Sequence, residues 1–221
     1  MREQSPIGIF GGTFDPVHLG HLRLAEEAAD KLGLAGVRWV PAGQPRHRET
    51  PQVAPMHRLQ MVQIATAGNP RFSIDRAEVE RDEISYTVPT LERLRQKFGP
   101  TQPLVLLLGA DAYAGLPAWH RWQEIFSLAH IAVAHRPGFV IDVETLPKAL
   151  ADEHRQRLAE APALAAETAG KITTYAMTPL AISATAIRAQ LAAGDSLRYL
   201  LPQPVIDYIH LHHLYRSNDG Y

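Results

Sequence analysis

Short apolar runs alternate with longer stretches of helical spacing along the whole chain. The clearest run is PLVLLLGAD, a continuous apolar segment closed by Gly109, which is typical of a strand buried on both faces. The strands predicted from such runs are Ile7–Phe10, Val37–Pro41, Phe72–Asp75, Leu104–Gly109, His130–His135 and Lys171–Tyr175.

Segments with helical spacing lie between these strands. They are His21–Leu32, Met56–Ala67, Tyr86–Phe98, Trp119–Ala129, Leu146–Ala161, Ala184–Ala193 and a closing helix, Val205–Leu214. Strands that alternate with helices predict an α/β fold, with an open, mostly parallel sheet and helices on both faces, as in a Rossmann-like doubly wound arrangement. We expect a single domain over residues 1–221, with a small helical subdomain at about 138–170 and a C-terminal helical segment at about 184–214.

The composition narrows the classes of function. Hydrophobic residues make up 46% and charged residues 20%, and no apolar run approaches the roughly 18 residues of a membrane span. The N-terminal stretch lacks the apolar region of a signal peptide. A net charge of -1 gives no electrostatic footprint for a nucleic-acid polymer, and the absence of cysteine excludes disulfides, thiolate zinc sites and thiol catalysis. We therefore expect a cytoplasmic protein that acts on small molecules, with neither nucleic acid nor membrane as a partner.

The stretch IFGGTFDPVHLGHL, at residues 9–22, predicts a phosphate site. Gly11 and Gly12 follow the first strand and lack β-carbons, so the backbone can turn sharply and a phosphate can approach its N–H groups. Asp15 precedes a proline and is therefore kept out of helical geometry. His18 and His21 would share one face of the first helical turn, where the free N–H groups and the helix dipole favour an anion.

Two simpler interpretations of this stretch stay open. A glycine pair is common in any tight turn between strand and helix, and these glycines do not have the spacing of the dinucleotide-binding fingerprint. Two histidines three residues apart could also bind a metal, but no third ligand with suitable spacing lies nearby, so we predict no metal site held by the protein.

A second candidate for anion binding is TPLAISATAIRAQLAAG, near the C-terminal end. Ser183 is a favoured N-cap residue, and Ala186 stands where a capping box would need Glu or Gln, so no nearby carboxylate takes the first-turn N–H groups. Thr185 adds a hydroxyl group, and Arg188 could bind phosphate oxygens with both arms of its guanidinium. The alternative is a capped surface helix with a solvated arginine.

GGTFDPVHLGH resembles the His-x-Gly-His signature of the nucleotidyltransferase superfamily and, more closely, the bacterial nicotinate-nucleotide adenylyltransferases. ISATAIR at 182–188 is similar to the Ile-Ser-x-Thr-x-Ile-Arg motif of that family, with Ala184 where many members have serine. The resemblance implies that His18, His21 and Arg188 are catalytic and contact ATP phosphates. The ATP-binding residues that it implies are Gly11, Gly12, Thr13, Phe14, His18, His21, Gly109, Asp111, Ser183, Thr185 and Arg188.

Three further stretches match the family in order. GQPRHRE at 43–49 resembles its basic Pro-Pro-His-Lys/Arg loop, with Arg46 in place of the second proline. In the stretch SYTVPTLERL, at 85–94, Ser85 is predicted to cap a helix. The stretch GADAYAGLPAWHRW, at 109–122, places Trp119 where the family stacks a tryptophan on the pyridine ring. The simpler alternatives for these three stretches are, in order, a solvated loop, a helix cap and an aromatic residue of the core. The implied nicotinate-nucleotide ligands are Asp15, Arg46, His47, Thr87, Trp119 and His120.

The resemblance implies transfer of the adenylyl group of ATP to nicotinate mononucleotide, which forms nicotinate adenine dinucleotide and pyrophosphate in NAD biosynthesis. Mg²⁺ would arrive with ATP, held mainly by phosphates and water. The alternatives are adenylyl or cytidylyl transfer to another small phosphate such as phosphopantetheine, and a noncatalytic nucleotide-binding sensor on the same fold. The sequence carries no signal for an oligomeric state.

Overall fold

A parallel sheet forms the centre of the computed structural model, which describes residues 4–45, 50–81, 83–138 and 141–215. Within these residues, six strands pair in the order β4-β2-β1-β6-β7-β8, and every neighbouring pair is parallel. The strands are β1 (Ile7–Gly12), β2 (Gly36–Pro41), β4 (Phe72–Ile74), β6 (Leu104–Gly109), β7 (His130–His135) and β8 (Ile172–Ala176). The predicted strands and the α/β class are confirmed.

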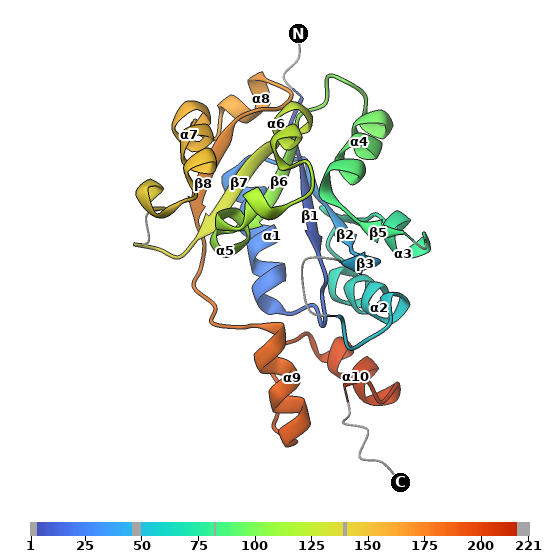
Figure 1. Ribbon diagram of the computed structural model, residues 1–221. Coiled ribbons are helices and arrows are strands. Elements are labelled where there is room, and N and C mark those ends of the chain that lie inside the picture. Colours follow the sequence, from blue (N-terminus) through green and yellow to red (C-terminus); the bar gives the residue numbers. More distant parts are fainter. Residues whose placement is uncertain (1–3, 46–49, 82, 139–140, 216–221) are drawn as a thin grey trace.

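The strand order reverses between β1 and β6. From β1 the chain moves outward through β2 to β4, then returns to pair β6 with the other side of β1, so that Ile7 lies between Gly36 and Leu104. Open parallel sheets bind their ligands at such a reversal, outside the carboxyl ends of the strands. In Figure 1, β1 points toward the end of the molecule that carries α9 (Ala184–Ala193) and α10 (Gln203–Leu211).

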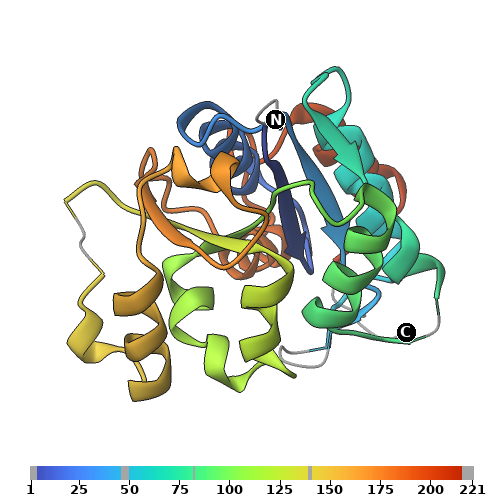
Figure 2. The same cartoon turned by 90° about the horizontal axis from the view of Figure 1, so that it is seen from above.

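Helices cover both faces of the sheet (Figure 2). One core is formed by α1 (Leu19–Lys31), α2 (Pro55–Thr66), α8 (Ala163–Ala166), α9 and α10, and the other by α4 (Thr87–Phe98), α5 (Ala110–Ala114), α6 (Ile125–Leu128) and α7 (Lys148–Arg157). Neighbouring strand residues alternate between the two cores, because successive side chains of a strand point to opposite faces. Leu107, for example, belongs to the first core, and Leu106 belongs to the second.

A short second sheet was not predicted. It pairs β3 (Gln44–Pro45) with β5 (Ile84–Ser85) in parallel, beside the short helix α3 (Ala77–Glu80). Strands of two residues carry no periodicity, so no sequence pattern could reveal them. Ser85 belongs to β5, and the residue that caps α4 is Tyr86, so the prediction that Ser85 caps this helix is wrong.

Two predicted helices differ from the structure. The stretch predicted as the helix Trp119–Ala129 holds the 3₁₀ turn Trp122–Glu124 followed by α6, after a further 3₁₀ turn at Leu116–Ala118. Arg121 interrupts it, because its φ of 56° is left-handed and cannot continue a helix. The helix predicted at Leu146–Ala161 is shorter, since α7 ends at Arg157 and the next residue, Leu158, forms a β-bridge with Ile172.

The segment expected as a helical subdomain at about 138–170 contains the 3₁₀ turn Val143–Thr145, α7 and α8. Leu150 of α7 and Leu164 of α8 are fully buried, one in each core. A hydrogen bond of 2.8 Å between the Tyr113 hydroxyl and His154 Nδ1 joins α5 to α7. None of the helices in the described ranges is long and apolar enough to cross a membrane.

Candidate active site

A cavity of about 390 Å³ opens at the carboxyl ends of β1 and β6, where the strand order reverses. Its floor is apolar and includes Ile9 of β1 and Leu106 and Leu108 of β6. Polar side chains from several loops and helix starts complete the lining, namely Thr13, Glu78, Ser85, Tyr86, Thr87, Thr90, Asp111 and His120. An apolar pocket with a few converging polar groups is typical of a small-molecule site.

The glycine turn forms one wall of this cavity through Gly11, Gly12 and Thr13. A β-carbon on Gly12 would lie 2.9 Å from the ring of Phe14, so only glycine fits there. The Phe14 ring itself is 2% exposed and packs edge-on against Phe10. Phe14 is thus buried in the structure, and its role in binding ATP stays a prediction.

His18 and His21 begin α1 directly after this turn. His18 is the N-cap, with extended backbone, and its N–H donates to Nδ1 of His21 at 3.2 Å. Because Nδ1 of His21 accepts this bond, the proton of a neutral His21 ring would lie on Nε2. The two rings stack, with centroids 3.6 Å apart.

His18 is buried, with only 6% of its surface exposed. Its Nδ1 has no hydrogen-bond partner among the residues that the structure describes. Burial lowers the pKa of His18 to about 4, so the ring is neutral at pH 7. An anion bound beside it would favour the charged form and would satisfy a polar atom that otherwise carries the cost of burial.

The second motif forms the start of α9. Ser183 is its N-cap, and its Oγ accepts from the Ala186 N–H at 3.1 Å, which confirms the predicted cap. Arg188 reaches back to the first motif, where its Nη1 donates to the Asp15 carbonyl oxygen at 2.8 Å. Nη2 of Arg188 lies 3.4 Å from the hydroxyl of Thr185. The two motifs that are far apart in sequence are therefore joined by direct contact.

Asp15 does not line the cavity, and its side chain is already engaged. It is 5% exposed, with Oδ1 accepting from the Tyr215 hydroxyl at 2.8 Å and Oδ2 from the Gln52 N–H at 2.9 Å. Both carboxylate oxygens therefore hold other parts of the chain, and the contact of Asp15 with the nicotinate nucleotide stays a prediction that the side-chain geometry does not support.

Four polar cavity residues were not among the predicted ligands: Glu78, Ser85, Tyr86 and Thr90. Glu78 accepts a hydrogen bond from the Thr90 hydroxyl, and burial raises the pKa of Glu78. The rings of Tyr86 and His120 lie 4.7 Å apart at the cavity wall. Tyr86 stands inside the matched SYT stretch and could have been chosen, whereas nothing in the spacing of Glu78 marks it.

Arg58 is a further residue that was missed. It is completely buried and donates to the carbonyl oxygens of Thr13 at 2.6 Å, Gly43 at 2.7 Å and Val53 at 3.1 Å. It therefore ties the glycine turn to the loop that follows β2. The signal was its place four residues before Val62, on the buried face of α2.

The predicted site residues fall into two neighbouring groups. Those that line the cavity are Gly11, Gly12, Thr13, Thr87, Asp111, Trp119 and His120. Those outside its lining are Phe14, Asp15, His18, His21, Gly109, Ser183, Thr185 and Arg188. Arg46 and His47 lie outside the described residues. In the described ranges, no group of three or more His, Asp or Glu side chains could hold a metal ion.

The chain is similar in sequence to proteins of one family. Residues 9–190 match the model of the family described as cytidylyltransferase-like. A protein of Dechloromonas aromatica named "Probable nicotinate-nucleotide adenylyltransferase" is 61% identical over 96% of this chain and 99% of its own. A protein of the same name from Pseudomonas aeruginosa is 47% identical over 96% of this chain and 97% of its own.

Solved structures show the same fold. The Plasmodium falciparum nicotinic acid mononucleotide adenylyltransferase complexed with NaAD superposes with a TM-score of 0.72, at 17% identity, over 96% of this chain and 98% of that chain. The same enzyme complexed with APC gives a TM-score of 0.70 over the same shares of both chains.

Proposed function

Because the chain belongs to the cytidylyltransferase-like family and, within it, to the nicotinate-nucleotide adenylyltransferases, we propose that it joins the adenylyl group of ATP to nicotinate mononucleotide. The products are nicotinate adenine dinucleotide and pyrophosphate. One observation supports this reaction above the others. The glycine turn of the first motif forms a wall of the same cavity as Thr87 and Trp119.

This arrangement would hold the two substrates on either side of the glycine turn. Trp119, Tyr86 and the start of α4 would receive the nicotinate nucleotide in the cavity. His18, His21 and the start of α9 would receive the triphosphate of ATP outside it, at the N-terminal ends of two helices. The phosphate of the nucleotide and the α-phosphate of ATP would then meet at Gly11, Gly12 and Thr13.

The chemistry needs positioning more than proton transfer. A phosphate oxygen of nicotinate mononucleotide forms a bond to the α-phosphorus, while the bond from that phosphorus to the bridging oxygen breaks and pyrophosphate leaves with the electron pair. Since the nucleophile is already anionic, no general base is required. His18 and His21 would donate hydrogen bonds to the charge that develops on the transferring group, and Arg188 would bind the leaving pyrophosphate.

The donor set fits a magnesium ion that is bound with ATP. Mg²⁺ prefers oxygen ligands and keeps several waters, so it does not need a cluster of protein carboxylates. When bound, it would neutralise charge on the phosphates. Asp111, in the first turn of α5 just after β6, lines the cavity and could reach its waters. That the enzyme works in the cytoplasm stays a prediction.

The test is an assay of the purified protein with Mg-ATP and a panel of acceptors. We expect pyrophosphate and dinucleotide with nicotinate mononucleotide. Turnover with phosphopantetheine, or with CTP in place of ATP, would favour the related transferases. Binding of ATP without pyrophosphate release for any acceptor would instead indicate a sensor.

A further inference from the structure

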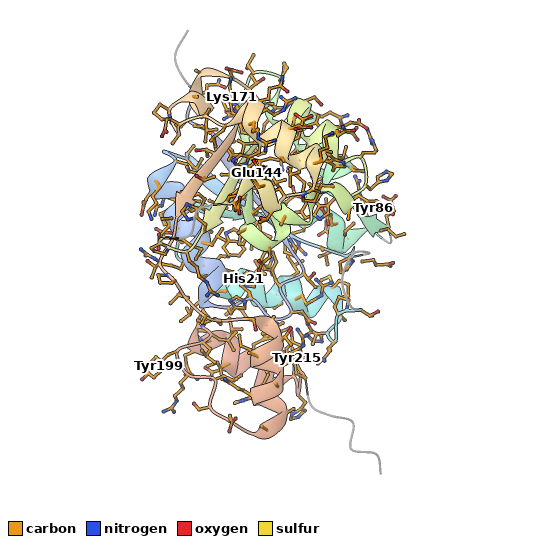
Figure 3. The ribbon with its side chains drawn as sticks, turned by 60° about the vertical axis from the view of Figure 1, so that its left-hand side comes forward. His21, Tyr86, Glu144, Lys171, Tyr199 and Tyr215 are labelled. Carbon is orange, nitrogen blue, oxygen red and sulfur yellow. The ribbon has the colours of Figure 1, made fainter. Side chains whose placement is uncertain are left out.

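The side chain of Tyr215 reaches the phosphate-binding end of the molecule from the opposite end of the sequence. Figure 3 shows Tyr215 where the C-terminal helices meet the rest of the protein, on the side of His21, with Lys171 at the other end. Tyr215 is buried, and its hydroxyl donates to Oδ1 of Asp15 at 2.8 Å. Its φ of 61° is unusual for a residue other than glycine, so the surrounding contacts must hold this conformation.

Asp15 is the point at which four segments meet. Tyr215 holds one carboxylate oxygen, and the backbone N–H of Gln52 holds the other. Arg188 of α9 donates to the carbonyl oxygen of Asp15, and its Nη1 lies 3.9 Å from the carboxylate. Asp15 itself lies three residues before His18. Asp15 therefore links Tyr215 to both the loop that leads to His18 and the guanidinium of Arg188.

The charges of Asp15 and Arg58 favour a fixed arrangement of the Tyr215 hydroxyl group. Burial, together with the negative charge of Asp15, raises the pKa of Tyr215, so its hydroxyl stays protonated and donates. The buried guanidinium of Arg58 interacts electrostatically with both residues and holds the Thr13 carbonyl on the other side of Phe14. A hydrogen bond from a protonated hydroxyl to a buried carboxylate is among the stronger ones, and it has a defined direction.

We propose that Tyr215 is a positioning residue for ATP, which acts through Asp15 to orient Arg188 and the loop before His18. This inference rests on the proposed role of these residues in binding the triphosphate. Tyr215 does not line the cavity, so the nicotinate nucleotide should be insensitive to it. The two substrates therefore respond differently to its loss.

Tyr215→Phe removes only the hydroxyl group and keeps the ring. The matched control is Tyr208→Phe, which also removes one hydroxyl with one 2.8 Å hydrogen bond, to His57, between α10 and α2. Binding of Mg-ATP alone is measured by calorimetric titration, and the KM of each substrate is measured in turnover. For Tyr215→Phe we expect ATP affinity to fall about tenfold, with the KM for nicotinate mononucleotide unchanged. Tyr208→Phe should match the unmodified protein.

Asp15→Asn provides a second measurement. It keeps the shape of the side chain but removes the charge that attracts Arg188, so the same selective loss of ATP affinity is expected. Unchanged ATP affinity in either variant overturns the proposal, as does an equal loss for both substrates accompanied by a large fall in Tm. If the unmodified protein binds ATP but forms no dinucleotide, the proposed function fails while the titrations still decide the role of Tyr215.

Discussion

The imidazole rings of His18 and His21 lie face to face, with centroids 3.6 Å apart and planes inclined by 23°. Two charged rings would repel each other at this distance, so the stacking favours a pair in which at least one ring is neutral. The lowered pKa of His18 agrees with this, because burial keeps that ring uncharged at pH 7. The pair thus holds its ring nitrogens in a fixed geometry, with the His18 ring uncharged.

The stability of the free protein should fall as His18 becomes protonated. The pKa of His18 is about 4 in the folded protein and 6.5 in the unfolded chain, so the unfolded state binds more protons between these values. The contribution of the neutral His18 ring to the free energy of unfolding is therefore fully present above pH 6.5. It is lost as the pH falls toward 4, by at most about 3 kcal/mol. Urea unfolding of the unmodified protein and of His18→Ala should show that the variant loses less stability over this range. Parallel pH profiles would contradict the prediction.

His18→Ala should lower kcat far more than it raises the KM for ATP. Loss of one preorganised donor typically costs roughly 10²–10³ in kcat. The control is His210→Ala, since His210 is exposed on α10 and should leave both parameters unchanged. A His18→Ala protein that keeps its Tm and near-normal turnover would exclude the assignment, and stoichiometric zinc in the unmodified protein would point to a metal site instead.

Arg188→Lys keeps the charge but loses the planar pair of donors. Because one arm of Arg188 already holds the carbonyl oxygen of Asp15, we expect weaker binding of ATP and pyrophosphate with a small change in Tm. Titration with each ligand and a thermal melt provide the measurement. A sharp fall in Tm with unchanged affinity would make Arg188 a structural residue alone.

The enzyme should prefer the nicotinate form of its nucleotide substrate. A carboxylate only accepts hydrogen bonds, whereas an amide also donates, so backbone N–H donors at the start of α4 and around Trp119 would favour the acid. We expect kcat/KM to be at least about tenfold higher for the nicotinate form, which corresponds to ~1.4 kcal/mol. Equal efficiency with the nicotinamide form would show that the pocket is not lined in this way.

The Trp119→Ala variant distinguishes ring stacking from the preference for the nicotinate form. The Trp119 side chain lines the cavity, and its loss should weaken both nucleotides by a similar factor, since both carry the same ring. The ratio of their kcat/KM values should therefore stay largely the same. A variant that loses the preference along with the affinity would place Trp119 in the recognition of the carboxylate.

Arg58→Met should destabilise the protein strongly. The change leaves the carbonyl oxygens of Thr13, Gly43 and Val53 buried without this donor, at a cost of about 1–3 kcal/mol for each group that finds no other partner. Arg76→Met is the control, because Arg76 makes an exposed ion pair with Glu80 that is worth about 1 kcal/mol or less. Urea unfolding should clearly separate the two variants. Equal losses in the free energy of unfolding would show that the three hydrogen bonds of Arg58 do not stabilise the fold.

The sequence predicted the elements in which one physical signal dominates. The strand Leu104–Gly109 and the helix Ala184–Ala193 have the predicted bounds. A buried apolar run marks the strand, and Ser183 and Gly194 mark the two ends of the helix. The helix at Trp119–Ala129 failed because the left-handed conformation of Arg121 leaves no trace in its residue type.

The residues of the candidate site also differ in whether a local sequence signal reveals them. Motif residues such as His18 and Ser183 were found by local spacing, since a helix start requires particular residues nearby. Arg58 and Tyr215 also contact carbonyl or carboxylate groups that are distant in sequence, up to 200 residues away. Such contacts depend on tertiary packing, which no local pattern encodes.

Away from the glycine turn, the cavity takes most of its lining from two stretches, residues 78–91 and 106–120, with Val40, Ala42 and Pro45 beside them. The two helix starts proposed to hold ATP lie elsewhere in the chain. In the proposed arrangement, recognition of the acceptor and binding of ATP therefore draw largely on different segments. We expect exchange of these two stretches between family members to change the acceptor while the transfer itself is kept. A fold built in this way can acquire substrates during evolution without rebuilding its catalytic machinery.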